Sequence, residues 1–302
     1  MCTIRDAHAR TVHAPAVTAG ALLGHVGGAS DPPFPAPAWP PLRLDRPLGV
    51  GADGGHGTVR YRVVAHEPGR RIRFAFALGR SGASPGHREL TVRPLGPDRC
   101  WVEHVLESRL PLARRIAWHL AIGCVHATVS EELLDNLERA AAGRLRAPVH
   151  RPPRARLLNR LGWDRPTAVP LPAGATLARS AFSCVDFRDA WQLPLRPGVP
   201  REPGAWQRAL RRAPFPVLAR RGGETLLGKE AGHLDFRASP LVTDDHVTLG
   251  TAVRIHHRGG RLHWAALGRL HPYVARGVLR RAHREVALSA PTAGERWWTH
   301  HP

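Results

Sequence analysis

The feature that most constrains the fold is a series of alternating apolar and polar residues followed by a long segment with helical spacing. Val59, Tyr61 and Val63 alternate with arginines, which predicts a half-buried strand. Apolar residues recur at helical spacing from Leu112 to Gly143, and a glycine commonly ends a helix. Strands followed by one long helix indicate the α+β class. Further strands are predicted at residues 9–13, 71–78, 90–92 and 100–110.

The second half of the chain repeats this order. Gly259-Gly260 predicts a two-residue hairpin turn that leads into a strand with Leu262 and Trp264. A closing helix is predicted from Pro272 to Leu288. We therefore predict two tandem α+β domains, each an antiparallel sheet with a long helix at its C-terminal end, although the halves do not match residue by residue. The other elements expected here are strands at 178–187, 215–219, 225–227, 233–242 and 247–255 and a short helix at 203–212.

A segment between the halves differs sharply in composition. Residues 144–176 contain seven arginines and six prolines, which predicts a semi-rigid linker. The predicted organisation is therefore a first domain, this linker, a second domain and a flexible tail, at residues 1–143, 144–176, 177–290 and 291–302.

The strong positive charge suggests a nucleic-acid partner at first. The chain has 44 Lys+Arg against 24 Asp+Glu, a formal net charge of +20, but Lys229 is the only lysine. An arginine excess together with abundant alanine, glycine and proline is typical of GC-rich coding bias, so we do not expect nucleic-acid binding. One alternative stays open, an adaptor that uses the arginine-rich linker and Arg276, Arg280 and Arg284 on nucleic acid or an anionic membrane.

Apolar stretches and cysteines exclude other classes. No uncharged apolar stretch reaches the length of about 18 residues that a membrane span requires, so we expect a cytoplasmic protein without a transmembrane segment. Four dispersed cysteines without a CxxC pair exclude a disulfide scaffold and a zinc ribbon. The oligomeric state stays open.

Four short segments of the first half carry a family resemblance. They are VHAPA at 12–16, GGHGTVRY at 54–61, PGRRIRF at 68–74 and EELLDN at 131–136. In this order they resemble the SRPBCC superfamily, the helix-grip fold shared by START lipid-transfer domains, birch-pollen-allergen relatives and polyketide cyclases. The resemblance implies a sheet wrapped on a long helix, with a cavity between them that holds a small hydrophobic molecule. It implies no established catalytic residue.

The second half resembles a bacterial domain of unknown function that is often found behind short-chain dehydrogenase-like domains. The segments that carry this likeness are GHLDFRAS at 232–239, VTLGTAVR at 247–254 and RGGRLHW at 258–264. The domain is related to the same helix-grip fold. No Gly-x-Gly-x-x-Gly fingerprint follows a predicted strand, so no dehydrogenase activity is carried over.

The inner face of each predicted sheet supplies the candidate ligand-binding residues. His104 shares a strand face with Val102 and Leu106, where a few polar groups would orient an apolar ligand. His104 is either a core histidine or the acid/base of a cyclase or dehydratase, and we favour ligand binding without catalysis. The candidate ligand-binding residues are Tyr61, Phe74, Phe76, His104, Thr251 and Trp264.

Nineteen histidines raise the question of a metal site. If Gly259-Gly260 forms the turn, His256 lies opposite His263, and such a pair can share a zinc ion. The same register places both on the outer face with Arg254, without a carboxylate or cysteine in local reach. We therefore predict no metal and no cofactor.

Overall fold

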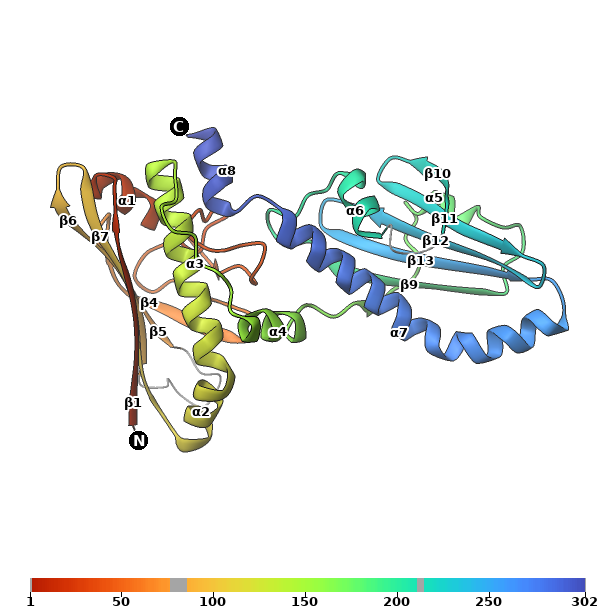
Figure 1. The fold of residues 1–302 in the computed structure, drawn as a ribbon, viewed down its shortest axis with the longest axis horizontal. Helices are drawn as coiled ribbons and strands as arrows, with labels where there is room; N and C mark the ends of the chain where they lie inside the picture. The colour runs from red at the N-terminus through yellow and green to blue at the C-terminus, as the bar shows by residue number, and fades with distance from the viewer. Residues whose placement is uncertain (1, 77–85, 211–214, 302) are drawn as a thin grey trace. The chain divides into compact units, whose positions relative to one another are not determined.

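The structure is a computed structural model, and it describes residues 2–76, 86–210 and 215–301 (Figure 1). The ends of the predicted strand 71–78 and of the predicted helix 203–212 lie outside the described residues. The chain divides into two compact units, which are considered separately. Unit 1 consists of residues 1–162 and 291–302, and unit 2 consists of residues 163–290.

In unit 1, the described strands form one antiparallel sheet in the order β1-β7-β6-β5-β4-β3-β2. β1 pairs with β7 along its whole length, so the first and last strands of the unit are neighbours. Cys100, Val102, His104 and Leu106 are buried on β7 while the residues between them are less so, as the alternation predicts. The strands are β1 (Cys2–Val12), β2 (Arg43–Leu44), β3 (Asp53–His56), β4 (Val59–Glu67), β5 (Arg71–Phe76), β6 (Gly86–Gly96) and β7 (Arg99–Leu110).

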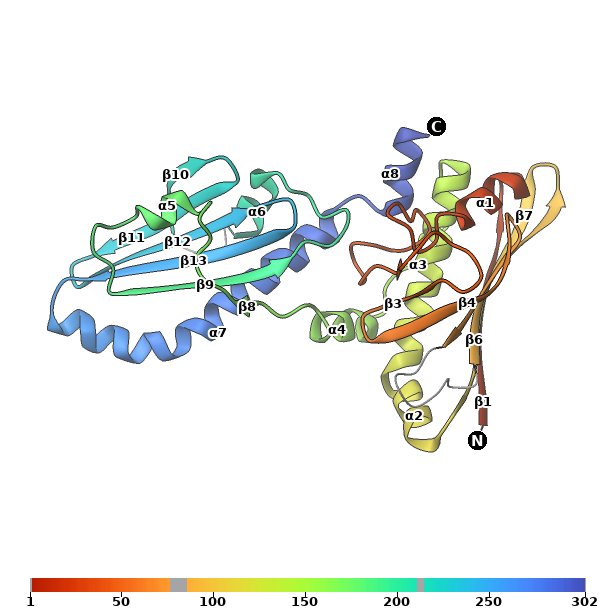
Figure 2. The ribbon, with the colours of Figure 1, turned by 180° about the vertical axis from the view of Figure 1, so that it is seen from behind.

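One long helical segment of unit 1 lies against a face of this sheet (Figures 1 and 2). It consists of α2 (Leu112–Ala117), a π-helical turn η2 (Trp118–Ile122) and α3 (Gly123–Ala142). Gly143 ends it at a positive φ of 69°, a left-handed conformation that glycine adopts without strain. The other helices here are α1 (Ala16–Leu23), α4 (Pro153–Leu161) and α8 (Ala293–His300).

In unit 2, the described strands form a second antiparallel sheet in the order β10-β11-β12-β13-β9-β8. The helix α7 (Arg258–Ser289) packs Leu279 and Ala282 against Leu193, Val247 and Leu249 of this sheet. The remaining elements are β8 (Thr167–Ala168), α5 (Thr176–Arg179), β9 (Phe187–Pro194), α6 (Pro203–Leu210), β10 (Val217–Arg221), β11 (Glu224–Ala231), β12 (Leu234–Val242) and β13 (His246–Ile255).

The hairpin predicted at Gly259-Gly260 is wrong. These glycines lie in the first turn of α7, whose start is capped by the His257 side chain accepting a hydrogen bond from the Gly259 amide. Gly260 is required by packing, because a Cβ there would lie 2.0 Å from the carbonyl oxygen of His233. Trp264 is therefore a helical residue, and the closing helix begins fourteen residues before Pro272.

The segments predicted to be a linker and a flexible tail contain regular structure. Residues 144–176 include α4 and β8, and residues 291–302 include α8, which begins with a capping box at Thr292 and Glu295. α8 belongs to unit 1, where a Cβ at Gly294 would lie 2.4 Å from the Asn136 carbonyl oxygen on α3. The strand predicted at 178–187 is also wrong, because strand β9 begins only at Phe187.

None of the described helices is long and apolar enough to cross a membrane.

Candidate functional site

A buried arginine lies on the inner face of the unit 1 sheet. Arg88, on β6, is only 4% exposed, and its Nε donates a hydrogen bond to Nε2 of His104 on β7 at 2.7 Å. The guanidinium carbon of Arg88 also lies 5.8 Å and 5.9 Å from the ring centroids of Tyr61 and Phe74. Both contacts are within the range of a cation–π interaction. A charged group is thus enclosed by aromatic rings and a neutral acceptor.

Among the described residues, Arg88 has no carboxylate partner. The Arg88 charge acts electrostatically on the Asp31 carboxyl group. Asp31 does not pair with Arg88, however, but accepts hydrogen bonds from the backbone amides of Gly27 and Phe34. Burial raises the pKa of Asp31 to about 6, against the smaller opposing effects of these hydrogen bonds and of Arg88. The guanidinium itself stays charged at any physiological pH.

His104 is held as a neutral imidazole. It is 1% exposed, and its burial together with the Arg88 charge lowers its pKa well below the ordinary value. Because Arg88 donates to Nε2, the ring proton is on Nδ1, which has no hydrogen-bond partner among the described residues. His104 therefore offers a donor at Nδ1 and no free basic nitrogen.

The structure brings the aromatic candidates of unit 1 together around Tyr61. The Tyr61 ring centroid lies 5.9 Å from that of Phe74 and 5.5 Å from that of Phe76. His56 on β3, which was not predicted, places its Nε2 3.0 Å from the Tyr61 hydroxyl. Burial, aided by the Arg88 charge, lowers the pKa of His56 to about 3, and burial raises the pKa of Tyr61.

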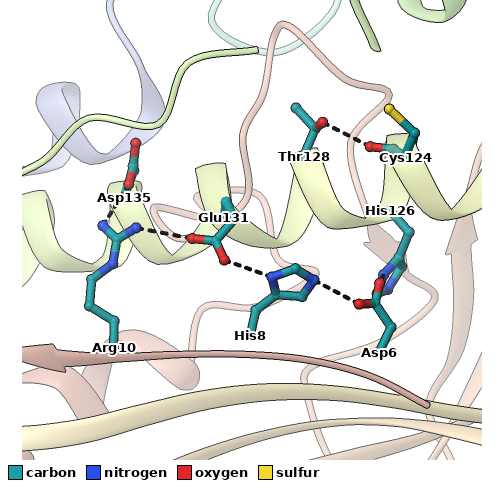
Figure 3. Close-up of polar contacts among 8 residues, drawn as sticks. All are labelled: Asp6, His8, Arg10, Cys124, His126, Thr128, Glu131 and Asp135. Atoms are coloured by element: carbon teal, nitrogen blue, oxygen red, sulfur yellow. Dashed lines mark hydrogen bonds and ion pairs between the residues drawn. The ribbon is translucent and has the colours of Figure 1, made fainter. Parts of the chain in front are cut away.

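A chain of charged side chains connects β1 to α3 (Figure 3). Asp6 and His8 lie two residues apart on one face of β1, and His126 faces them from α3. His126 Nδ1 lies 2.7 Å from Asp6 Oδ2, and His8 Nε2 lies 3.0 Å from Asp6 Oδ1. On its other side, His8 Nδ1 lies 2.6 Å from Oε1 of Glu131. Arg10 then binds the carboxylates of Glu131, Asp135 and Glu138.

The electrostatics of this chain keep Asp6 ionised. Burial alone would raise the pKa of Asp6, but the hydrogen bonds from His126 and His8 outweigh it and hold that pKa well below its usual range. The hydrogen bond to Asp6 raises the pKa of His8 against partial burial. Burial lowers the pKa of His126, whose ring stacks on that of His104 with the centroids 5.3 Å apart. The charged chain and the Arg88 cluster therefore meet at this pair of rings.

The two candidate ligand-binding residues of unit 2, Thr251 and Trp264, lie around a pair formed by an aspartate and a histidine. Thr251 on β13 is opposite Asp189 of β9, and Trp264 on α7 has its ring centroid 5.6 Å from that of His271. His271 Nε2 lies 3.2 Å from Asp189 Oδ1, and Trp191 Nε1 donates to Asp189 Oδ2 at 2.9 Å. The predicted residues thus surround an Asp–His pair that the sequence analysis did not identify.

The predicted hairpin pair His256 and His263 does not form. His256 Nε2 lies 3.1 Å from Asp235 Oδ2, so a carboxylate is within its reach after all. His263 lies on α7, where its ring contacts that of His233 at a centroid distance of 4.7 Å. In the described part of the chain, the two histidines that converge on one carboxylate are His8 and His126, at Asp6.

Two hollows lie away from these clusters. In unit 1, residues 24–30 and 43–48 line an open groove of about 580 Å³. In unit 2, a pocket of about 100 Å³ is lined by Gln207, Leu210, Phe215, Val217, Arg220, Thr225, Leu227 and Pro240. Neither contains a predicted site residue, so the clusters are assigned from their contacts and charge.

Sequence reasoning missed Asp6, His8, Arg88 and His126. The predicted first strand began only at Ala9, whereas β1 begins at Cys2. The available signal was the spacing of Asp6, His8 and Arg10, which places three ionisable side chains on one face of a strand. Because that pattern is polar, it lacks the apolar alternation on which strand prediction depends.

No protein-family model and no curated protein matches the chain. Solved structures with a similar course include a protein from Thermobifida fusca, 21% identical, covering 50% of this chain and 99% of its own at a TM-score of 0.38. Norcoclaurine synthase from Thalictrum flavum, in complex with dopamine and hydroxybenzaldehyde, is 15% identical over 48% of this chain and 90% of its own, with a TM-score of 0.36. CalU16 from Micromonospora echinospora is 14% identical over 53% and 93%, with a TM-score of 0.33.

The class follows from the chain's own topology. Each unit has an antiparallel sheet whose first long strand pairs with its last, and a long helix after the last strand packs on the sheet. The protein is therefore an α+β protein with two tandem helix-grip-like units.

Proposed function

We propose that unit 1 binds a small, largely hydrophobic molecule bearing an anionic or strongly hydrogen-bonding oxygen, without catalysing a reaction. The observation that carries this proposal is Arg88, a buried cation whose polar partners are the neutral side chains His104 and Tyr61. Removing a guanidinium from water costs several kcal/mol unless a counter-charge compensates it. A ligand oxygen would supply that compensation.

The surroundings of Arg88 favour an apolar ligand body. Tyr61, Phe74 and Leu90 are at most 4% exposed, and they lie on the inner face of the sheet. Sites for small molecules combine such apolar walls with a few placed polar groups. The Nδ1–H group of His104, without a partner among the described residues, is a second donor of this kind.

The geometry argues against His104 as an acid/base. A general base needs a free lone pair, and Nε2 of His104 already accepts from Arg88. A general acid needs a proton that leaves near neutral pH, and the depressed pKa of His104 keeps the imidazole neutral. The cyclase or dehydratase alternative is therefore the weaker one.

The adaptor alternative loses support in unit 2. Nε of Arg280 donates to the carbonyl oxygens of Trp163 and Asp164, and Nε of Arg276 donates to the carbonyl oxygen of Pro272. The guanidinium carbon of Arg284 lies 6.0 Å from the Trp163 ring centroid. These arginines serve contacts within the unit and do not form a free basic face.

A pair of matched fluorescent probes tests the proposal on the full chain. Anilinonaphthalene sulfonate carries an anionic group, whereas N-phenylnaphthylamine has similar rings and no charge. We expect Arg88→Met to weaken binding of the sulfonate at least tenfold and to leave the neutral probe unaffected. The matched control is Arg237→Met in unit 2, where the buried guanidinium already pairs with Glu230 at 2.7 Å.

Three results would count against this function. They are equal sulfonate affinity in wild type and Arg88→Met, equal loss of both probes, and an equal loss in Arg237→Met. Native mass spectrometry of freshly purified protein provides an independent readout, and a copurified acidic, apolar molecule that disappears in Arg88→Met is the expected result.

A further inference from the structure

Three potential metal ligands converge between β1 and α3 of unit 1 (Figure 3). One ligand atom from each of Asp6, His8 and His126 lies within 4.8 Å of the others. Asp6 and His8 are two residues apart on a strand and point to the same side, while His126 approaches from the helix. Two rigid elements therefore hold the group, as an effective metal site requires.

The hydrogen-bond arrangement of His8 requires a cation. Its Nδ1 faces the Glu131 carboxylate at 2.6 Å and its Nε2 faces the Asp6 carboxylate at 3.0 Å. Ionised carboxylates only accept hydrogen bonds, and a neutral imidazole has only one N–H to give. A second proton on His8 or a metal ion near Nε2 would resolve the conflict.

The groups around the three ligands match those of a metal-binding histidine. A ligating histidine commonly donates its other nitrogen to a carboxylate, which fixes the tautomer, and Glu131 occupies that place for His8. Glu131 is itself held by Arg10 at 3.2 Å. Such an arrangement orients Nε2 of His8 as a lone-pair donor toward Asp6.

The local charge favours a cation. Four carboxylates gather here against the one guanidinium of Arg10, and they belong to Asp6, Glu131, Asp135 and Glu138. Another nearby cation is Arg88, which donates a hydrogen bond to His104, and the His104 ring stacks on that of His126. Even with Arg88 included, negative charge is in excess.

We propose that Asp6, Nε2 of His8 and Nδ1 of His126 bind one divalent transition-metal ion of the zinc or iron(II) class. A set of two imidazoles and one carboxylate suits these borderline ions better than Ca²⁺ or Mg²⁺, which prefer oxygen ligands. The side chains of Asp6, His8 and His126 are 24%, 13% and 16% exposed, so the ion can exchange with solvent and keep an open position. The inference does not rest on the ligand proposed for Arg88.

Unit 2 contains the comparison that makes the inference specific. Asp189 and His271 repeat the Asp6–His126 pair, but the residue two positions after Asp189 is Trp191, whose Nε1–H donates to the carboxylate. An indole N–H is a donor only and cannot bind a metal. In the described part of unit 2, the Asp189 pair therefore has no third ligand.

Calorimetric titration of the metal-free full chain with zinc chloride tests the site. With nineteen histidines, weak background binding is expected, so the decisive quantity is the difference between wild type and variants. We expect one tight zinc ion per chain, weakened at least 100-fold in His8→Ala and in His126→Ala. The matched controls His271→Ala and His256→Ala, each removing a histidine beside a carboxylate, should retain wild-type affinity.

A second variant and a spectroscopic readout cover a loss of folding. Glu131→Gln leaves all three ligands in place and is expected to weaken zinc about 10- to 100-fold. Cobalt(II) bound by the wild type should give visible absorption bands that disappear in His8→Ala and persist in His271→Ala. Absence of a tight zinc ion in the wild type overturns the proposal and leaves a protonated His8 as the cation. Wild-type affinity in His8→Ala or His126→Ala overturns it as well.

Discussion

The two units place an Asp–His pair at corresponding positions of the same framework. In unit 1, Asp6 pairs with Leu106, four residues before the end of β7, and His126 follows that end by sixteen residues. In unit 2, Asp189 pairs with Thr251, four residues before the end of β13, and His271 follows that end by sixteen residues. The repeat that the sequence suggested only as an order of elements thus extends to a polar contact between first strand and long helix.

The pairs differ in what stands two residues further along the first strand. His8 places a nitrogen that is able to bind a metal ion beside Asp6, whereas Trp191 at the corresponding position donates its Nε1–H to Asp189. The framework therefore supports two outcomes. A donor-only residue completes a structural contact, and an imidazole leaves a cation-binding arrangement.

Buried charges show the same contrast. Glu224 of unit 2 is 1% exposed and accepts from the amides of Leu177 and Ala178 at 2.8 Å and 2.9 Å and from the Ser239 hydroxyl at 2.6 Å. Arg88 of unit 1 is also buried, but its hydrogen-bond and ring partners among the described residues are neutral. A satisfied buried charge indicates a structural role, whereas an uncompensated one indicates a ligand.

The largest expected effect is a loss of stability of unit 1 at acidic pH. The folded His56 has a pKa of about 3 against an ordinary value of 6.5, so the unfolded state takes up a proton that the folded state refuses as pH falls below 6.5. The stability that His56 contributes is present above pH 6.5 and is lost toward pH 3, by up to about 4 kcal/mol. We expect His56→Gln to reduce this loss in unit 1.

Hydrogen exchange followed by mass spectrometry measures this effect in each unit separately, because it reports local opening. The exposed His150 supplies the control His150→Gln, which should keep the wild-type slope. In unit 2, the pKa of His283 is lowered only to about 4, by burial and by the Arg196 charge. Unit 2 should therefore lose less stability at acidic pH than unit 1. An unchanged slope in His56→Gln would contradict the assignment.

The next effect distinguishes the two buried charges. Glu224→Ala leaves the amides of Leu177 and Ala178 and the Ser239 hydroxyl without their acceptor, so unit 2 should lose about 3 kcal/mol. Urea denaturation combined with hydrogen exchange in unit 2 measures the loss. Asp244→Ala, which removes a 91% exposed carboxylate of unit 2 that lies 4.0 Å from the exposed Arg201, is the control and should change stability by less than about 0.5 kcal/mol.

The sequence predicted the sheets well and the polar site poorly, for related physical reasons. Strands such as β4 and β7 bury one face, and the alternation of their residues reports that burial directly. The start of α7 was missed because Gly259-Gly260 suits a hairpin locally, and the contact with the His233 carbonyl, distant in sequence, decides the outcome. Inward-facing polar residues of β1 break the apolar pattern, so the part of the strand before Ala9 was missed together with its site residues.

At Arg88, the other buried charge, we expect a smaller change in the free energy of unfolding than at Glu224, and one of opposite sign. Arg88→Met replaces an uncompensated cation by an apolar side chain of similar length, so the free energy of unfolding should stay constant or rise by up to about 2 kcal/mol. Urea denaturation of the ligand-free chain measures it. A loss of more than about 2 kcal/mol would assign Arg88 a structural role like that of Glu224 and would weaken the ligand proposal.

The smallest effect on stability, and the sharpest test of the comparison, comes from exchanging the two residues that distinguish the pairs. His8→Trp gives unit 1 the donor-only group of unit 2, so the tight zinc ion should be lost. Trp191→His gives unit 2 an imidazole beside Asp189 and His271, and one additional, weaker zinc ion should bind. Zinc stoichiometry from calorimetry measures both. If His8→Trp keeps its zinc, or Trp191→His gains none although it folds, the residue two positions after the Asp does not decide between a structural contact and a metal site.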